Sequence, residues 1–238
     1  MKLPYKMCPP MSAQDSKKCF GLFNRRERWG LSPRGWLVLI VGTAAIGLFF
    51  LLNIRPFLAP TQRENTRILV VEGWAGHNTM IAALAEFQTR HYEKVYTTGG
   101  PVNDGDTNAP STWAGRGADL LVKTGFPAGQ VQPVPAGIVM RDRTYSSARA
   151  LREWFLQHHL VVSSLNVLTE DVHARRTRLL FQEAFGRNVR IGIISVPDPG
   201  YDPKRWWHYS EGVRVIISES IAYGYARFLF HPVEPSDR

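Results

Sequence analysis

The chain has 238 residues and a formal net charge of +9, of which the first 34 residues supply +6 through eight basic and two acidic side chains. This concentration in a tail, rather than on a folded face interleaved with aromatics, argues against nucleic acid as a partner. Both cysteines, Cys8 and Cys19, lie in the same tail, which excludes a disulfide framework for the rest of the chain.

An uncharged apolar run, WLVLIVGTAAIGLFFLLNI, occupies residues 36–54. As a helix it covers about 28 Å, close to the hydrocarbon thickness of a bilayer. We therefore predict a transmembrane helix that inserts in the lipid bilayer; a buried helix of a soluble domain is the alternative. The positive-inside tendency predicts a cytoplasmic tail at 1–35 and an extracytoplasmic C-terminal part. Residues 58–60 make a poor signal-peptidase site, which favours an uncleaved, single-pass anchor in the plasma (inner) membrane.

Residues 55–66 mix prolines with polar residues and predict a linker. The remaining residues, 67–238, suffice for one domain with one buried core. Short apolar runs in it alternate with segments of helical period. The expected strands are 67–72, 94–98, 131–135, 165–169 and 189–196, and the expected helices are 78–91, 111–124, 144–158, 173–185 and a long, mostly buried helix within 201–230. This alternation predicts an α/β fold with a Rossmann-like, doubly wound, mainly parallel sheet.

The predicted strand ends are the first candidates for a site, because ligands of doubly wound sheets bind beyond the carboxyl ends of the strands. These ends fall at Glu72, Thr98 and Thr169. The turns that follow include Gly73 and Gly99-Gly100, whose backbone can approach a ligand closely. A plain tight turn explains the Gly-Gly-Pro sequence equally well.

The strand 165–169 passes within four residues into a helix that opens with His173, Arg175 and Arg176. A helix start presents unpaired N–H groups and the positive end of the helix dipole. Two guanidinium groups and an imidazole at this place predict a pocket for a phosphate-like or carboxylate-like ligand. The alternative is structural, with His173 capping or packing the helix.

A second helix start carries Arg141, Arg143 and Thr144, which could face the same crevice. Its alternative reading is an N-cap with solvated arginines. No HExxH motif and no paired cysteine spacing occur, and the first turn lacks GxGxxG. We therefore expect neither a metal site nor a nucleotide cofactor.

Roles can be assigned to these side chains as a hypothesis. Arg143 and Arg176 would bind the anion bidentately, and His173 would donate or accept a proton, since an imidazole titrates near neutral pH. Glu72 could orient that imidazole or act as a base.

Several of these elements occur together in one known family. They are Glu72-Gly73, Thr98-Gly99-Gly100, a helix start with Thr144, and a junction that joins Thr169 to His173 and Arg176. In this respect residues 67–196 resemble the YdcF-like family. The family often has Glu-Asn shortly after its threonine, where this chain has two serines, and the acidic residue usual after Gly-Gly is not evident. The resemblance implies a membrane-anchored, Rossmann-like domain of the cell envelope, connected with peptidoglycan or its polyprenyl-phosphate carrier.

Site chemistry and resemblance together predict a protein that binds or processes a phosphorylated or otherwise anionic envelope precursor. Two classes of function stay open. One is an enzyme, a hydrolase or transferase acting on that precursor, and the other is a non-catalytic scaffolding or recruiting factor. An arginine-rich helix start serves binding as well as catalysis, so the sequence does not separate them.

Overall fold

The computed structural model describes residues 23–25, 29–102, 112–139 and 141–232. Most of the predicted basic tail and the loop through Asp104 and Pro110 lie outside these residues. The chain divides into two compact units, Met1–Leu52 and Asn53–Arg238.

The first unit consists of a small hairpin and most of a long helix. Strands β1 (Phe23–Arg25) and β2 (Trp29–Leu31) pair antiparallel, and α1 (Pro33–Leu58) follows. Ser32 caps α1 by accepting a hydrogen bond from the Gly35 amide at 3.1 Å. The most apolar window of α1 has a mean hydropathy of 2.5, and none of it is buried, unlike a core helix of a soluble domain. This helix is long and apolar enough to span a membrane.

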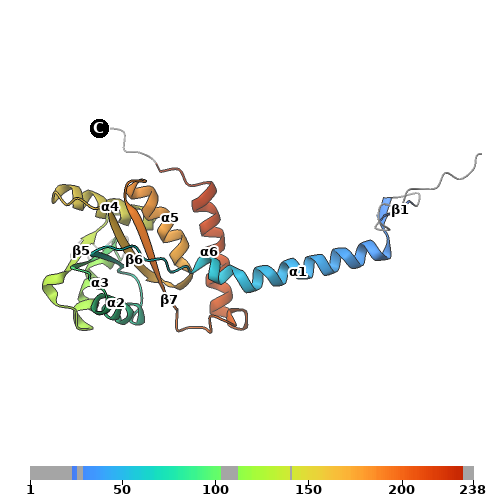
Figure 1. The fold of residues 1–238 in the computed structure, drawn as a ribbon, viewed down its shortest axis with the longest axis horizontal. Coiled ribbons are helices and arrows are strands. Elements are labelled where there is room, and N and C mark those ends of the chain that lie inside the picture. Colours follow the sequence, from blue (N-terminus) through green and yellow to red (C-terminus); the bar gives the residue numbers. More distant parts are fainter. Residues whose placement is uncertain (1–22, 26–28, 103–111, 140, 233–238) are drawn as a thin grey trace, which may run out of the picture. The chain divides into compact units, whose positions relative to one another are not determined.

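The second unit is built on a five-stranded, all-parallel sheet (Figure 1). Its strands are β3 (Ile68–Glu72), β4 (Lys94–Gly99), β5 (Val131–Pro135), β6 (Ser164–Glu170) and β7 (Arg190–Val196). The order across the sheet is β5-β4-β3-β6-β7, so the winding direction reverses between β3 and β6. This is the predicted doubly wound, Rossmann-like sheet, and every predicted strand is found within one residue of its expected ends.

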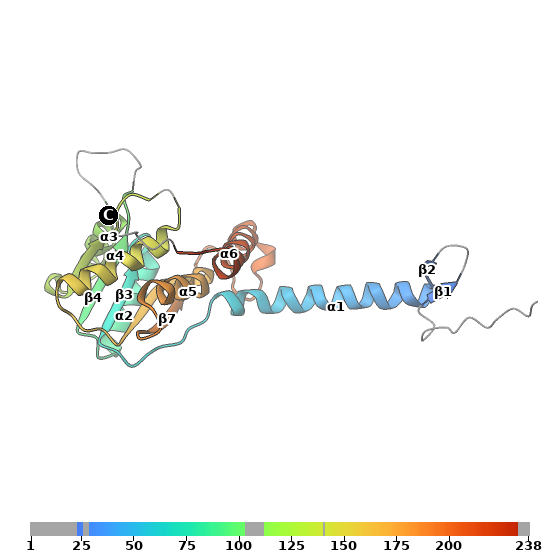
Figure 2. The ribbon, with the colours of Figure 1, turned by 90° about the horizontal axis from the view of Figure 1, so that it is seen from above.

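Helices cover both faces of this sheet (Figure 2). Alternate residues of β3 point to opposite faces, so Leu69 and Val71 pack with Met80 and Leu121, whereas Val70 packs on the other side. The first face is covered by α2 (His77–Thr89) and α3 (Trp113–Lys123), and the second by α4 (Arg143–Gln157) and α5 (Ala174–Phe185). Three short 3-10 turns are η1 (Ala128–Gln130), η2 (Asp171–His173) and η3 (Trp206–His208).

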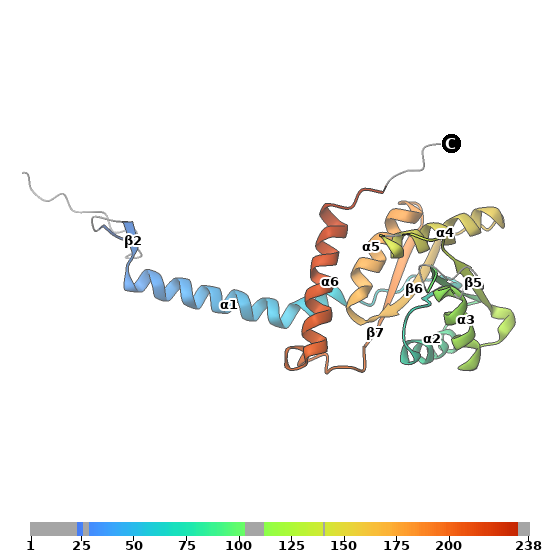
Figure 3. The ribbon, with the colours of Figure 1, turned by 180° about the vertical axis from the view of Figure 1, so that it is seen from behind.

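The C-terminal helix α6 (Ser210–Phe228) runs alongside α5 and outside these layers (Figure 3). Our prediction that this helix is mostly buried is wrong. Its buried residues are Gly212, Ile216, Glu219 and Ala226, whereas Ile217, Ile221 and Phe228 are exposed. The physical reason is that α6 packs mainly on α5 and the neighbouring 3-10 turns, so only one side of the helix is covered.

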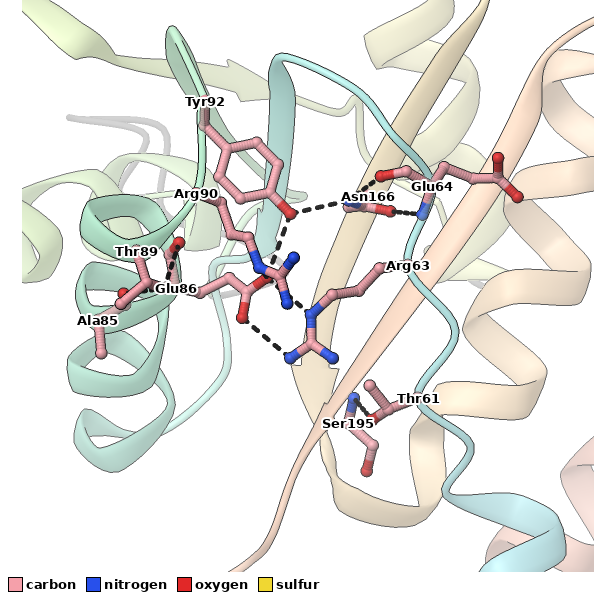
Figure 4. Close-up of polar contacts among 10 residues, drawn as sticks. All are labelled: Thr61, Arg63, Glu64, Ala85, Glu86, Thr89, Arg90, Tyr92, Asn166 and Ser195. Atoms are coloured by element: carbon pink, nitrogen blue, oxygen red, sulfur yellow. Dashed lines mark hydrogen bonds and ion pairs between the residues drawn. The ribbon is translucent and has the colours of Figure 1, made fainter.

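The segment that joins α1 to β3 packs on the domain. The helix α1 continues through residues 55–58, and the chain then crosses the outer edge of β7, where Gln62 and Ile193 exchange backbone hydrogen bonds of 2.8 and 2.7 Å. Figure 4 shows its side-chain contacts: Arg63 binds Glu86 through two hydrogen bonds of 2.8 and 2.9 Å, and the Asn166 side chain pairs with the Glu64 backbone. We call residues 59–66 the strap.

Candidate functional site

A cavity of about 650 Å³ lies at the carboxyl ends of β3 and β4, beside the point where the winding reverses. The starts of α3, α4 and α5, the loop after β5, and one side of α6 complete its wall. The structure brings most predicted site residues into its lining: Glu72, Thr98, Gly99, Gly100, Arg141, Arg143, Thr144, His173 and Arg176. Local rules about strand ends and helix starts therefore converge on one pocket.

Three predicted site residues do not line this cavity. Thr169 is fully buried behind it, where its hydroxyl donates a hydrogen bond to the Glu72 carboxylate. Gly73 packs against α3. Arg175 points to the end of α1, where its guanidinium lies 4.0 Å from the centre of the Phe57 ring and hydrogen-bonds the Phe57 carbonyl.

Gly73 and Gly99, at two strand ends, allow a close approach of α3. A Cβ at Gly73 would lie 2.1 Å from the Trp113 carbonyl oxygen, and a Cβ at Gly99 would lie 2.5 Å from the Trp113 Cβ. Gly117 lies in α3 itself, where a Cβ would come within 2.5 Å of the Gly73 Cα. Since contacts this short do not occur between real side chains, these glycines fix how closely the start of α3 approaches the sheet.

Glu72 is a buried carboxylate held by hydroxyl groups. It is 3% exposed and accepts hydrogen bonds from Thr169 and, at 3.1 Å, from Thr177 of α5. The Glu72 side chain thus ties the end of β3 to β6 and α5 across the reversal point, while the residue still lines the cavity.

His173 and Arg176 are paired with a carboxylate that sequence reasoning missed. Glu219 of α6 lies 2.9 Å from the His173 Nδ1 and accepts two hydrogen bonds of 2.8 Å from Arg176. Burial alone would raise the pKa of Glu219, but the hydrogen bonds from His173 and Arg176 outweigh it and lower the pKa to about 2. The residue that contacts the imidazole is therefore Glu219, whereas the hydrogen-bond donors described for Glu72 are threonines.

The Arg176 guanidinium is thereby committed to a structural contact. Burial lowers its pKa, but the bidentate contact with Glu219 outweighs burial and raises it. Because the Nε and Nη2 atoms both point at Glu219, the bidentate anion contact that we predicted for Arg176 is already made within the protein. The imidazole is further fixed by Trp74, whose ring meets it edge-on at 4.8 Å between centroids.

The start of α4 provides the cationic rim of the cavity. Arg141 and Arg143 are exposed, and the only ion pair that either forms among the described residues is a 3.9 Å contact between Arg141 and Asp142. Asp142 adopts a left-handed backbone (φ 57°) and gives no side-chain cap to the helix. The positive end of the α4 dipole and two guanidinium groups make this the electropositive part of the site.

The floor of the cavity contains a polar atom without a partner. The Thr98 side chain is 1% exposed, and its hydroxyl has no hydrogen-bond partner among the described residues. A buried hydroxyl left in this state costs on the order of 1–3 kcal/mol. Its neighbour Thr97, also buried, donates to the Ala114 carbonyl at 2.7 Å.

The remaining wall is apolar and comes largely from segments that carry no sequence motif. Its side chains include Trp113, Ile138, Leu180, Tyr225 and Phe230. The strand-end rule does not point to α6, and no local pattern signals the contact between Glu219 and Arg176, which lie 43 residues apart. The site therefore combines a cationic rim, a polar floor and an apolar side.

A second network connects the end of α1 to the turn that carries His173. Asp171 in η2 is 2% exposed and has a left-handed backbone (φ 40°). Its carboxylate accepts a hydrogen bond from Arg55 at 2.6 Å and another from the Tyr201 hydroxyl. Burial and the nearby Asp171 carboxylate both raise the pKa of Tyr201.

Within the described part of the chain, no group of three or more His, Cys, Asp or Glu side chains is arranged to hold a metal ion. No protein-family model, no curated protein and no solved structure matches the chain.

Proposed function

We propose that this protein is a single-pass plasma-membrane protein whose α/β domain binds a phosphorylated or otherwise anionic cell-envelope precursor, of the polyprenyl-phosphate class, in the cavity beside α4. The observation that carries the proposal is a buried hydroxyl without a partner together with exposed guanidinium groups at the rim of the same cavity. The Thr98 hydroxyl is buried without a partner on the floor, and Arg143 is exposed at an uncapped helix start on the rim.

The anionic group would bind at the start of α4. Arg141 and Arg143 have guanidinium groups available to pair with phosphate oxygens, and the first-turn amides add N–H donors. Arg176 would contribute its positive charge only in part, since Glu219 already neutralises it. The apolar side of the cavity, with Trp113 and Phe230, suits the hydrocarbon part of such a precursor.

Processing of the precursor would involve His173. If its Nδ1–H donates to Glu219, the Nε2 atom is left as the proton acceptor, which is the arrangement that carboxylates impose on catalytic imidazoles. The alternative, a non-catalytic recruiting factor, is favoured by the closed contact between Arg176 and Glu219, which removes a guanidinium from the place where a reacting phosphate would sit.

The proposed orientation places the N-terminal tail in the cytoplasm and the domain outside it. The support is the excess of basic residues before α1, which the positive-inside tendency assigns to the cytoplasmic side. The resemblance to the YdcF-like family supports the envelope context. The uncharged run 36–54 within α1, together with the unburied apolar window of that helix, supports the anchor.

A pair of neighbouring threonines gives a matched test of the pocket. We expect Thr98→Val in the full-length protein in detergent to keep or raise the thermal unfolding temperature while weakening calorimetric binding of farnesyl phosphate about tenfold, because a pocket hydroxyl is lost. Thr97→Val, which removes a satisfied buried hydroxyl, should lower stability by about 1 kcal/mol or more and leave affinity unchanged.

The arginines provide the second arm of the test. Arg143→Gln should weaken farnesyl phosphate binding, whereas Arg152→Gln, at an exposed position on the same helix, should not. Equal affinity of the wild type and both pocket variants would refute the proposed ligand site.

Turnover separates the two classes of function. A polyprenyl-diphosphate-linked sugar would be incubated with the wild type and with His173→Asn, and the products followed by mass spectrometry. Product that depends on His173 establishes an enzyme, and saturable binding without product establishes a recruiting factor.

A further inference from the structure

The outer side of α6 carries an uncovered apolar stripe. Ile217, Ile221 and Phe228 are 52%, 69% and 76% exposed, and they lie on one side of the helix because they are spaced by four and seven residues. Leu229, just after the helix, is 67% exposed and continues the patch. Isolated apolar side chains on a surface are ordinary, but a contiguous row along a helix indicates a binding face. We call Ile217, Ile221, Phe228 and Leu229 the α6 stripe.

The helix that carries this stripe is fastened to the chain where it leaves the apolar run. Tyr223 of α6 packs edge-on against Phe57 at 5.5 Å between ring centroids, and Leu58 is 1% exposed. The Arg175 guanidinium also packs on the Phe57 ring, and Arg55 forms an ion pair with Asp171. All these contacts lie within the second unit, so the domain holds the last turn of α1 firmly.

The covalent distance then limits how far α6 can lie from a bilayer. Phe57 follows the end of the apolar run by three residues, which cover only about 5 Å in a helix and about 10 Å when extended. If α1 spans the membrane, α6 must lie close to the lipid headgroups. An apolar helix face in that position is close enough to contact the lipid.

The residues around the stripe have the composition of a lipid interface. Lys204, Arg205 and Arg227 are exposed, and Tyr209 and Tyr225 are each 43% exposed. Amphipathic aromatics and basic side chains collect at the headgroup level of a bilayer. By contrast, Trp206 is buried and packs in the protein interior.

We propose that the α6 stripe docks on the surface of the lipid bilayer. Tyr225 lies next to the stripe in the helix and also lines the cavity. Docking of the stripe would therefore place the mouth of the pocket beside the lipid headgroups. The choice of lipid as the occupant rests on the proposed anchor and not on which ligand the cavity takes, and the docking itself is tested separately from both. It adds that the domain lies against the membrane instead of standing free on its tether.

Fluorescence quenching by lipids tests this contact in the full-length protein. Cys8 and Cys19 would be replaced by serine, and a single cysteine introduced by Ile221→Cys would carry an environment-sensitive fluorophore. Leu156→Cys, a 61% exposed apolar position on α4, is the matched control. In phosphatidylglycerol-containing vesicles with nitroxide-labelled headgroups, we expect about twofold quenching at 221 and little at 156, because an interfacial helix buries its apolar side at that depth.

The possible outcomes separate docking from anchoring. Quenching at 221 in protein that resists carbonate extraction supports both, and quenching in protein that carbonate removes supports docking while refuting the anchor. Equal quenching at 221 and 156 in carbonate-resistant protein overturns docking and leaves the anchor intact. Energy transfer between labels at 221 without lipid quenching would identify a second copy of the chain as the occupant and likewise overturn the proposal.

Discussion

Glu72, which lines the cavity, and Glu219, which holds His173 and Arg176, are both buried carboxylates, but their surroundings give them different characters. Glu72 is held by the hydroxyls of Thr169 and Thr177, which are neutral donors. Glu219 is held by the Arg176 guanidinium and the His173 imidazole, so its negative charge is strongly favoured. The charged pair therefore fixes α6 to α5, whereas Glu72 is a buried acidic group in the lining of the cavity.

The stabilisation from Glu219 should disappear in acid. Its pKa is about 2 in the folded protein against an ordinary value of 4.5, so its contribution is complete above pH 4.5 and is lost as the pH falls towards 2. Between pH 6 and pH 3 the wild type should lose on the order of 2 kcal/mol that Glu219→Gln does not lose. Thermal unfolding followed by circular dichroism over this range measures the difference.

A suitable control for this prediction is Glu211→Gln. Glu211 is a half-exposed glutamate on the same helix, paired with Arg214, and its removal should leave the acid dependence of the wild type almost unchanged. Parallel pH profiles for the wild type and Glu219→Gln would contradict the assigned role of Glu219.

At the scale of elements, the glycines decide how α3 sits on the sheet. Gly117 and Gly73 bring the helix and the strand end into backbone contact, which places Trp113 at the wall of the cavity. Helix propensity alone would favour alanine over glycine at position 117. The close approach must therefore outweigh propensity at this position.

Gly117→Ala should consequently destabilise the protein by about 1–3 kcal/mol, as overpacking of a fitted contact does. Gly224→Ala, in the interior of α6 where a Cβ would meet nothing within 4 Å, should instead stabilise by up to about 1 kcal/mol. Chemical denaturation in detergent compares the two. A gain in stability for both variants would show that α3 can move away from the sheet without cost.

At the scale of the whole molecule, the network around Asp171 joins the end of α1 to the turn that carries His173. Asparagine tolerates the left-handed backbone about as well as aspartate, so Asp171→Asn removes mainly the charge. Arg55, whose Nε is buried without a partner among the described residues, would then lose its counter-charge. We expect a loss of about 2 kcal/mol or more in thermal unfolding.

The comparison for that substitution is Asp142→Asn, at the other left-handed aspartate that starts a helix. The contact between Asp142 and the exposed Arg141 is long, at 3.9 Å. The loss of the Asp142 charge should therefore change the free energy of unfolding by less than about 0.5 kcal/mol. Similar losses of stability at both positions would show that the ion pair between Asp171 and Arg55 does not stabilise the fold.

Much of this architecture could be predicted because its signals are local. The alternation of apolar strands and amphipathic helices predicted a doubly wound, mainly parallel sheet. The rule that ligands bind at the carboxyl ends of the strands predicted that Glu72, Thr98 and His173 lie at one site. The partner of His173 could not be predicted, since Glu219 reaches it from a helix with no motif and across 43 residues of sequence. The direction of Arg175 depends on the docking of Phe57, and apolar composition does not say which side of α6 is covered.

The strap has a consequence for a domain that is separated from α1. Gln62 pairs with the outer backbone groups of Ile193, and Thr61 accepts a hydrogen bond from the Ser195 amide at 3.1 Å, so the strap covers part of the outer edge of β7. A fragment cut at residue 67 would keep every strand of the sheet yet leave the Ile193 backbone groups and the Ser195 amide on the outer edge of β7 unpaired, and an open edge recruits other chains. We expect such a fragment to aggregate more readily than one cut before the strap.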